Sequence, residues 1–481
     1  MTIKSGLLTD LYELTMMQGY YHYDLNPRVV FDMFFRRQPF HGGFSVFAGL
    51  DDLLTVLENL HFSEDDLEYL DSLGMFHQDF LDELKNFRFR GDIWAMDEGT
   101  AVFPHEPLIR VHASLMEAQL IESVLLNIIN FQTLVATKTA RIYLAANHGK
   151  VAEFGLRRAQ GVDGAISASR AAYIGGAAAT SNVYAGKRFN IPVTGTMAHS
   201  WVMAFDDERE AFDKFAELYP DAAILLIDTY DTLDSGIPNA VEIGKRLKEK
   251  GKPFGVRLDS GDIQYLSIQV RKALDAAGLT DATIAASNEL NEDIIHQLVA
   301  AGTPIDLWGV GTHLVTGGSE ASFSGVYKLA AKEVNGVFQP TMKVSDNPEK
   351  STNPGIKQVY RFLHEEGNPL ADLITFDGDG IDADRTYNFH HPYVDYRHFR
   401  MRPHGPVIPL LKKYMENGTV VGRRPTLAEI QAHARRNLDS LDQTYRRIIN
   451  PHIYKVSISD SVKNTKGEML EKYLGNHKEE H

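Results

Sequence analysis

The sequence predicts an α/β protein whose central part is a parallel sheet covered by helices. From about residue 150 onward, short apolar strands alternate with helices, which is typical of parallel sheets built from strand–helix–strand units. The strand candidates are residues 151–154, 177–181, 191–196, 222–228, 253–259, 283–287 and 305–310. Seven candidates in succession favour a closed or nearly closed barrel, and a doubly wound sheet is the alternative.

The first 150 residues are predicted to mix helices and strands. We expect helices over 11–21, 51–60 and 64–73, and strands over 29–37, 93–96 and 107–114. A largely buried helix over 114–130 begins with Ser114 and Glu117, which have the spacing of a capping box. The helix over 136–149 ends at Gly149, as helices commonly end at glycine.

The later part of the chain continues with helices and one long polar segment. Amphipathic helices are predicted over 209–219, 238–250, 263–278, 291–302 and 426–447. Residues 343–360, KVSDNPEKSTNPGIKQVY, predict a long ordered loop or an interdomain segment. The C-terminal NHKEEH predicts a solvated tail. We therefore expect an N-terminal α/β domain over 1–130, a barrel domain over 131–340 and a smaller C-terminal domain over 341–481.

Composition excludes several classes of function. The 481 residues contain no cysteine, which excludes disulfides, cysteine-ligated zinc, iron–sulfur clusters and a cysteine nucleophile. The formal net charge of −15 disfavours nucleic acid and acidic membranes as partners. The N-terminus lacks the apolar stretch of a signal peptide, and no run approaches the length of a membrane span. We expect a cytoplasmic protein.

Polar residues follow each predicted central strand. The segments are GLRR, NVYAG, MAHSW, TYDTLDSG, SGD, NEL and GTHLVTGG. In a barrel the carboxyl ends of the strands form one rim, where active sites are built. A single segment of this kind can also be a turn with helix caps, and Ser260 and Asp262 fit that reading. Seven such ends in a row predict a shared site.

The chemistry of these segments points to a phosphorylated ligand. Arg157, Arg158 and Arg257 carry forked cationic donors suited to carboxylate or phosphate. Backbone N–H groups can approach a phosphate at Gly309, Gly311, Thr312, Gly317 and Gly318, although a tight turn explains such glycines equally well. Carboxylates for ribose hydroxyls or Mg²⁺ are available at Asp228, Asp231, Asp259 and Asp262. Together they fit a substrate with phosphates, ribose and magnesium.

His199 lies among small residues in GTMAHSW, directly after a predicted strand. For one of 19 histidines, a polar surface position is the ordinary interpretation. Its place on the same rim favours a role in chemistry. In a chain without cysteine, histidine is the strongest nucleophile available near neutral pH.

An ordered set of motifs resembles a known enzyme family. The motifs are TDLYELTM, EFGLRRAQG, AATSNVYAG, GTMAHSW, DTYDTLDSG, GVRLDSGD, ASNELNE, GVGTHLVTG and KVSDNPEKSTNPGIKQVYR. This set closely resembles the nicotinate phosphoribosyltransferases over roughly residues 5 to 460. The resemblance implies a type II phosphoribosyltransferase fold: an irregular α/β barrel, an N-terminal α/β domain and a smaller C-terminal region. It also implies a homodimer whose active site is completed across the subunit interface.

The resemblance implies a reaction as well. The family forms nicotinate mononucleotide and diphosphate from nicotinate and phosphoribosyl pyrophosphate, the first step of NAD salvage from nicotinate. ATP is a co-substrate whose hydrolysis is coupled through a transient phosphohistidine, and Mg²⁺ is required. The phosphorylated histidine of the family lies in a G-T-x-A-H motif, which places it at His199. Magnesium would be held mainly by the substrate phosphates.

The resemblance also assigns roles to individual residues. It implies that nicotinate stacks between Phe154 and Tyr12 of the partner subunit, because a flat ring favours offset stacking. It places Arg157 and Arg257 near the pyridine and phosphate groups. It places the remaining matched residues around the ribose, phosphates and pyrophosphate: Asp228, Asp259, Ser287, Gly309, Gly311, Thr312, Lys343 and Lys350. Asp10 and Arg37 also match positions near the site.

Ser181 bears on the choice of base. Nicotinamide-using relatives carry an aspartate there, which would repel the carboxylate of nicotinate and accept hydrogen bonds from an amide. Serine therefore favours the acid. The alternatives are a nicotinamide phosphoribosyltransferase, another magnesium-dependent barrel enzyme such as a lyase or aldolase, and a ligand-sensing barrel without catalysis.

Overall fold

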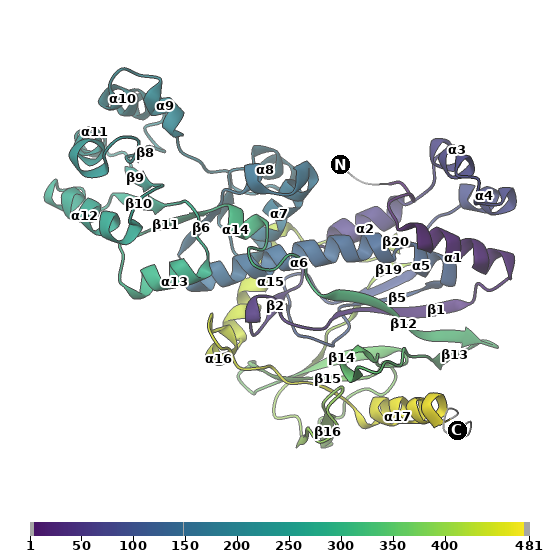
Figure 1. Ribbon diagram of the computed structural model, residues 1–481. Coiled ribbons are helices and arrows are strands. Elements are labelled where there is room, and N and C mark those ends of the chain that lie inside the picture. Colours follow the sequence, from purple (N-terminus) through teal and green to yellow (C-terminus); the bar gives the residue numbers. More distant parts are fainter. Residues whose placement is uncertain (1–3, 148, 476–481) are drawn as a thin grey trace. The chain divides into compact units, whose positions relative to one another are not determined.

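The computed structural model describes residues 4–147 and 149–475, and the chain forms two compact units (Figure 1). One unit comprises Met1–Leu134 and Ser322–His481, and the other comprises Val135–Ala321. The boundaries 1–130, 131–340 and 341–481 stay a prediction, while in space the first and last parts of the chain belong to one unit. The predicted tail over 476–481 lies outside the described residues.

The unit Val135–Ala321 is built around one parallel sheet. Its strands are β6 (Lys150–Glu153), β7 (Ala179–Thr180), β8 (Ile224–Leu226), β9 (Gly255–Leu258), β10 (Thr283–Ala286) and β11 (Leu307–Val310). They pair in the order β7-β6-β11-β10-β9-β8. Six of the seven predicted strands are thereby confirmed. The segment 191–196 instead contributes only a single parallel bridge, between Val193 and Thr180.

The strand order is that of a barrel with one open position. A doubly wound sheet reverses its order at a switch point, whereas here strands that follow one another in sequence are neighbours. The first and last strands, β6 and β11, also pair. Among the described residues no strand pair joins Val193 to β8, and we call this open position the seam. The α/β fold class is thus confirmed, with an irregular, incompletely paired barrel.

Helices cover the strands of this unit. They are α7 (Gly161–Gly175), α8 (Val183–Phe189), α9 (His199–Met203), α10 (Glu208–Leu218), α11 (Ile237–Glu249), α12 (Ile263–Ala276), α13 (Glu292–Ala300) and α14 (Thr312–Val315). In Figure 1, α11 and α12 lie along the same side of β8 to β10. Apolar side chains such as Phe212, Ile243 and Val270 are buried there with Leu225 and Val256. Each such side chain contributes about 1.5–3 kcal/mol relative to exposure.

The helix predicted over 114–130 is interrupted early and then runs further than expected. Ser114 caps α5 (Leu115–Leu120) in a capping box with Glu117, as predicted. After Ile121, α6 (Glu122–Ala145) continues without a break, so the predicted gap between residues 130 and 136 was wrong. No glycine or proline lies between residues 122 and 145 to end the helix.

The other unit holds three sheets. Its strands are β1 (Arg28–Phe35), β2 (Ser45–Val46), β3 (Asp92–Ala95), β4 (Ala101–Val102), β5 (Ile109–Ser114), β12 (Gly325–Val334), β13 (Val337–Pro340), β14 (Lys357–Leu363), β15 (Pro369–Phe376), β16 (Tyr387–His390), β17 (His398–Met401), β18 (Val407–Pro409), β19 (Lys412–Glu416), β20 (Thr419–Val420) and β21 (Val456–Ile458). The orders are β13-β12-β1-β5-β3-β19-β20, β17-β16-β21-β15-β14-β18 and β2-β4. The seven-stranded sheet therefore joins strands from both ends of the chain, whereas the other two sheets each use strands from one end.

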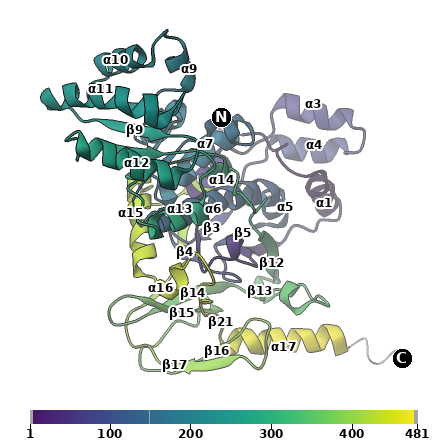
Figure 2. The same ribbon diagram turned by 60° about the vertical axis from the view of Figure 1, so that its left-hand side comes forward.

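Helices of this unit match the predictions in part. Besides α5 and the first half of α6, they are α1 (Leu11–His22), α2 (Leu50–Asn59), α3 (Glu64–Ser72), α4 (Gln78–Lys85), α15 (Leu427–Ser440), α16 (Gln443–Arg446) and α17 (Asp460–Gly475). Figure 2 shows α17 beside β16, which it contacts. The helix predicted over 426–447 divides at Leu441 into α15 and α16. The predicted loop over 343–360 ends earlier, where β14 begins at Lys357. None of the helices in the described parts of the chain is long and apolar enough to cross a membrane.

Candidate active site

A pocket of about 300 Å³ lies among the residues that follow the carboxyl ends of the parallel strands. It is formed within the unit Val135–Ala321 alone. Nine predicted site residues line it: Phe154, Arg157, Ser181, Arg257, Asp259, Ser287, Gly309, Gly311 and Thr312. Arg158 lines it as well. These residues lie on or directly after five different strands, so the sheet brings together side chains that are far apart in the sequence.

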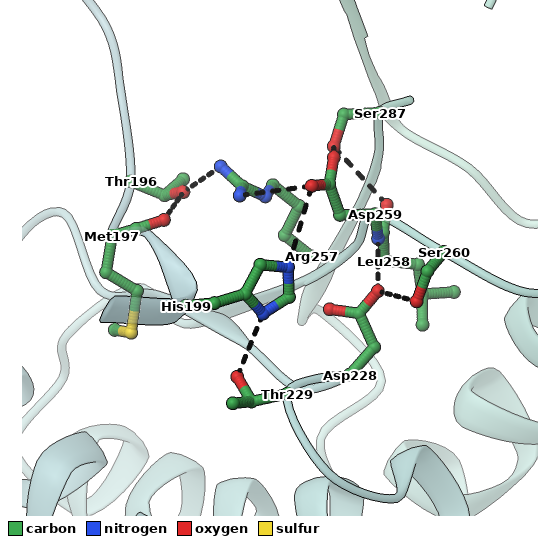
Figure 3. Close-up of polar contacts among 10 residues, drawn as sticks. All are labelled: Thr196, Met197, His199, Asp228, Thr229, Arg257, Leu258, Asp259, Ser260 and Ser287. Carbon is green, nitrogen blue, oxygen red and sulfur yellow. Dashed lines mark hydrogen bonds and ion pairs between the residues drawn. The ribbon is translucent and has the colours of Figure 1, made fainter. Parts of the chain in front are cut away.

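Arg257, on β9, carries a charge that its surroundings only partly compensate (Figure 3). Its Nη1 donates to Thr196 Oγ1 at 2.5 Å, and its Nη2 lies 3.9 Å from Asp259 Oδ2. The buried Nε has no hydrogen-bond partner in the described structure. Burial lowers the pKa of the guanidinium, and Asp259 and Asp228 oppose that shift. A partly compensated cation in a pocket can bind an anionic ligand.

His199, the first residue of α9, is held on both sides of its ring. Its Nδ1 lies 3.1 Å from Thr229 Oγ1, and its Nε2 lies 3.7 Å from Asp259 Oδ2 (Figure 3). Thr229 follows β8, while His199 follows the segment at Val193, so this contact bridges the seam. The imidazole is 39 % exposed. The ring is therefore both oriented and accessible to a ligand.

Asp228 and Asp259 form the acidic part of the site; Asp259 lines the pocket, whereas Asp228 is not among its lining residues and contacts the main chain of Asp259. Asp228 Oδ2 accepts hydrogen bonds from the Asp259 N–H at 2.8 Å and the Ser260 hydroxyl at 2.7 Å (Figure 3). Asp228 Oδ1 is buried and has no partner within the described residues. Asp259 accepts a 2.5 Å hydrogen bond from the Ser287 hydroxyl. The two carboxylates are thereby fixed next to each other at the ends of β8 and β9.

The other predicted carboxylates have structural roles. Asp262 caps α12 by accepting from the Tyr265 N–H, as the capping interpretation required. Asp231 caps the helical turn Thr232–Gly236 in the same way. Ser260 does not have the predicted capping role, because Asp262 is the N-cap of α12 and the Ser260 hydroxyl donates to Asp228. In residues 4–147 and 149–475, no three histidine, aspartate or glutamate side chains gather as a metal site.

Five further candidates belong to the other unit. They are Tyr12, Lys343 and Lys350, together with Asp10 and Arg37. Their roles at the pocket stay predictions. Gly317 and Gly318 belong to the same unit as the pocket but are not among the residues that line it.

Several residues of the site were missed by sequence reasoning. Thr196 and Thr229 are the partners of Arg257 and His199, and a threonine in a polar turn gives no signal of this kind. Asn288 and Glu289 line the pocket with positive φ angles of 80° and 38°. Asparagine tolerates this conformation, but glutamate rarely adopts it, and such backbone strain gathers at functional sites.

Gly309 was predicted to bring its N–H group near a phosphate, and the structure shows that it also makes room for the Phe154 ring. A Cβ at this position would lie 2.7 Å from two ring carbons of Phe154 and 3.3 Å from Ser287 Cβ. The absence of a side chain on β11 therefore allows the Phe154 ring to lie against the strand. Phe154 also keeps its backbone N–H bonded to the Val310 carbonyl at 2.8 Å. This fixes the position of the ring at the edge of the pocket.

A buried ion cluster holds α13, which follows the Asn288–Glu289 turn. Glu292 forms an ion pair with Lys138 at 2.6 Å and accepts a hydrogen bond from Arg141 Nε at 3.0 Å, and all three side chains are at most 5 % exposed. Burial raises the pKa of Glu292, but Lys138, Arg141 and hydrogen bonds outweigh it, so the net shift is downward from 4.5. The stabilisation is therefore present above pH 4.5 and is lost as the pH falls through the lowered value.

Glu292→Gln should lower the free energy of unfolding by about 3–5 kcal/mol at neutral pH, because it removes the buried negative charge that pairs with both Lys138 and Arg141. Denaturant unfolding would measure the loss, and the variant should also lose less stability than wild type below pH 4.5. The control is Glu242→Gln, which breaks an exposed pair with Arg209 and should cost less than about 1 kcal/mol. Equal, small losses for both variants would contradict the prediction.

Comparisons with known proteins assign the family. Sequence models of the nicotinate phosphoribosyltransferase N-terminal domain, family and C-terminal domain match residues 7–130, 149–368 and 356–466. A nicotinate phosphoribosyltransferase of Bacillus subtilis is 44 % identical over 95 % of this chain and 93 % of its own length. The chain belongs to the nicotinate phosphoribosyltransferase family. The predicted resemblance is thereby confirmed.

Two further relatives of the family agree. The nicotinate phosphoribosyltransferase pncB2 of Mycobacterium tuberculosis is 40 % identical over 95 % of this chain and 92 % of its own length. The crystal structure of human nicotinic acid phosphoribosyltransferase superposes with a TM-score of 0.85 at 31 % identity, covering 96 % of this chain and 99 % of that one. The similarity therefore spans both units of the fold.

Proposed function

We propose that the chain transfers the phosphoribosyl group of phosphoribosyl pyrophosphate to nicotinate, giving nicotinate mononucleotide and diphosphate. The observation that carries this proposal is the single pocket that combines Phe154, Arg157 and Arg257 with Asp259. An aromatic ring and cations suit a pyridine carboxylate, and a carboxylate suits ribose hydroxyls. Membership of the family supports the same reaction.

The proposed transfer needs positioning and charge neutralisation. The pyridine nitrogen of nicotinate attacks C1 of the ribose, and the C1–oxygen bond to pyrophosphate breaks with its electron pair leaving on oxygen. The pyridine nitrogen carries no proton at neutral pH, so no general base is required. Phe154 and Arg257 would hold the base in line with C1, and donors around Gly311 would stabilise the leaving phosphates.

Mg²⁺ fits the acidic part of the site. The free buried oxygen of Asp228 and the neighbouring Asp259 are hard oxygen donors of the kind that Mg²⁺ prefers. Two carboxylates are fewer ligands than the ion takes, in keeping with an ion held mainly by substrate phosphates. Bound there, it would neutralise charge on the departing pyrophosphate.

His199 would couple ATP hydrolysis to the transfer. One imidazole nitrogen would attack the γ-phosphorus of ATP, ADP would leave, and water would later release phosphate. The orientation of the ring by Thr229 and its exposed edge support this role. The added charge would reorganise the segment around the seam and tighten substrate binding. The product would enter NAD biosynthesis, and a cytoplasmic location, where phosphorylated metabolites are retained, is part of this proposal.

Assembly as a homodimer would complete the base site. In this proposal Tyr12 of the partner subunit stacks on nicotinate opposite Phe154. Lys343 and Lys350 reach the pyrophosphate. Size measurement in solution, together with mixing of two differently inactivated variants, tests the shared site.

The base preference separates this proposal from its nearest alternative. Ser181 lines a pocket with Arg157 and Arg257, which favours an anionic base over a neutral amide. Nucleotide formation would be measured with phosphoribosyl pyrophosphate, Mg²⁺ and either nicotinate or nicotinamide, each with and without ATP. We expect nicotinate turnover, raised by ATP and matched by ADP release. A preference for nicotinamide would overturn the assignment of the base, and no turnover of either would overturn the proposed function.

Gly309→Ala should raise the KM for nicotinate by about tenfold, because the new methyl group overlaps the Phe154 ring and must displace it. Steady-state kinetics with nicotinate as the varied substrate would measure the change. Gly467→Ala is the control, because a Cβ there meets nothing within 4 Å. An unchanged KM in Gly309→Ala would mean that the ring position does not govern binding of the base.

A further inference from the structure

Glu153 is a buried carboxylate next in sequence to the pocket residue Phe154, and nothing in the proposed mechanism uses it. It is the last residue of β6 and is 1 % exposed. Its Oε1 accepts from the Gly155 N–H, and its Oε2 accepts from the Ser169 hydroxyl at 2.8 Å and the Thr180 hydroxyl at 2.5 Å. All three are neutral donors. Converging donors suit an ionised carboxylate, which only accepts hydrogen bonds.

These donors come from segments that carry the predicted base site. Gly155 begins the turn between Phe154 and Arg157, which both line the pocket. Thr180 ends β7 and immediately precedes Ser181, which also lines it. The main chain of Glu153 adds a further link, because its carbonyl accepts from the Ser181 N–H at 2.9 Å. Glu153 is thus hydrogen-bonded to two segments that line the pocket, the Phe154–Arg157 turn after β6 and the Thr180–Ser181 segment at the end of β7. We call these two segments the pocket walls.

The network extends beyond the two walls. Thr180 Oγ1 accepts from the Asn182 N–H at 2.9 Å, and Asn182 caps α8 by accepting from the Ala185 N–H at 3.1 Å. Ser169 lies on α7, the helix that connects β6 to β7. Buried polar networks of this kind fix one geometry when every member has a partner. Burying a carboxylate is otherwise costly, so the cost is offset only by these hydrogen bonds.

We propose that Glu153 is a positioning residue that sets the separation of the Phe154–Arg157 turn from Ser181 and so determines how tightly the base is held. This inference rests on the proposed function. It predicts an effect on binding of the base alone. The hydrogen bonds described for the network include none to Asp228, Asp259 or His199, which are proposed to act on the ribose, the phosphates and ATP. Loss of the network should weaken nicotinate binding without comparable effects on phosphoribosyl pyrophosphate or on ATP coupling.

The test begins with Thr180→Val, which removes one donor to Glu153 at nearly constant shape. We expect the KM for nicotinate to rise about tenfold, with kcat and the KM for phosphoribosyl pyrophosphate changed less than about threefold. Thr180→Ser keeps a hydroxyl and should restore the KM. The control is Thr139→Val, a fully buried threonine of the same unit whose hydroxyl donates to the Val135 carbonyl one helical turn before it. It should behave as wild type.

Glu153→Gln provides the second variant and guards against misfolding of the first. It should also raise the KM for nicotinate. In the double variant with Thr180→Val, the fold-increase in this KM should be smaller than the product of the two single fold-increases. A nicotinate KM within twofold of wild type in both variants would overturn the proposal. So would equal changes in both KM values and kcat together with a lowered Tm, which would indicate a purely structural role.

Wild-type turnover distinguishes failure of this inference from failure of the proposed function. If wild type turns over nicotinate and the variants leave its KM unchanged, only the role of Glu153 is overturned. If wild type does not turn over nicotinate, the proposed function is overturned and the inference with it.

Discussion

His199→Ala should abolish ATP hydrolysis linked to nucleotide formation while leaving a slow, ATP-independent transfer to nicotinate. The imidazole contacts Thr229 and Asp259 at the seam, and the transfer step needs no proton from it. Removing the ring therefore removes the proposed phosphoryl acceptor but leaves the pocket residues in place. The measurement is nucleotide formed and ADP released by the same sample, with and without ATP.

His296→Ala is the matched control, because this histidine is exposed on α13 of the same unit. It should keep both ATP stimulation and ADP release. Complete loss of transfer in a folded His199→Ala protein would contradict the division between the two reactions. Unchanged ADP release would show that the phosphoryl group is accepted elsewhere.

Arg257→Gln should lower kcat/KM for nucleotide formation by about 10²–10³-fold, the range for loss of one preorganised electrostatic group. Its guanidinium lies between Thr196 and Asp259 with one buried nitrogen unpartnered, so its charge is compensated fully only when an anion binds. For the same reason the substitution should leave Tm unchanged or raise it, because a poorly compensated buried charge destabilises the folded state.

Arg271→Gln is the control for Arg257→Gln, and we expect it to affect stability rather than activity. Arg271 pairs with Asp275 and donates to the Ala282 and Leu279 carbonyls, and none of these four residues lines the pocket. Its replacement should lower Tm and leave kcat/KM close to wild type. If Arg257→Gln instead lost stability and kept activity, Arg257 would be a structural residue.

The barrel and its rim could be predicted because both depend on local pattern. Apolar strands and amphipathic helices alternate regularly, and polar residues at strand ends meet wherever the strands are parallel. The segment 191–196 has the same pattern, but only Val193 pairs. Pairing depends on the neighbouring strand, which the sequence of the segment does not contain. Similarly, Asp231 and Asp228 have the same chemistry, and only the structure separates a cap from a site residue.

Long-range features escaped prediction for a different reason. β1 pairs with β12, and β3 pairs with β19, across some 300 residues of chain in each case. No local signal reports such a partner, so these strand pairs cannot be predicted from either end of the chain alone. Glu153 was missed because a single glutamate in an apolar strand resembles any other rim residue. Its importance lies in three donors that the fold brings to it.

The seam has a mechanical consequence. Across every other junction of the parallel sheet, moving one strand past its neighbour breaks backbone hydrogen bonds, whereas at the seam the contact is between the side chains of His199 and Thr229. A phosphoryl group on His199 would compete with that side-chain contact and leave the strand ladders intact. The proposed phosphorylation site therefore lies at the junction of the sheet where a displacement of the strands breaks the fewest backbone hydrogen bonds.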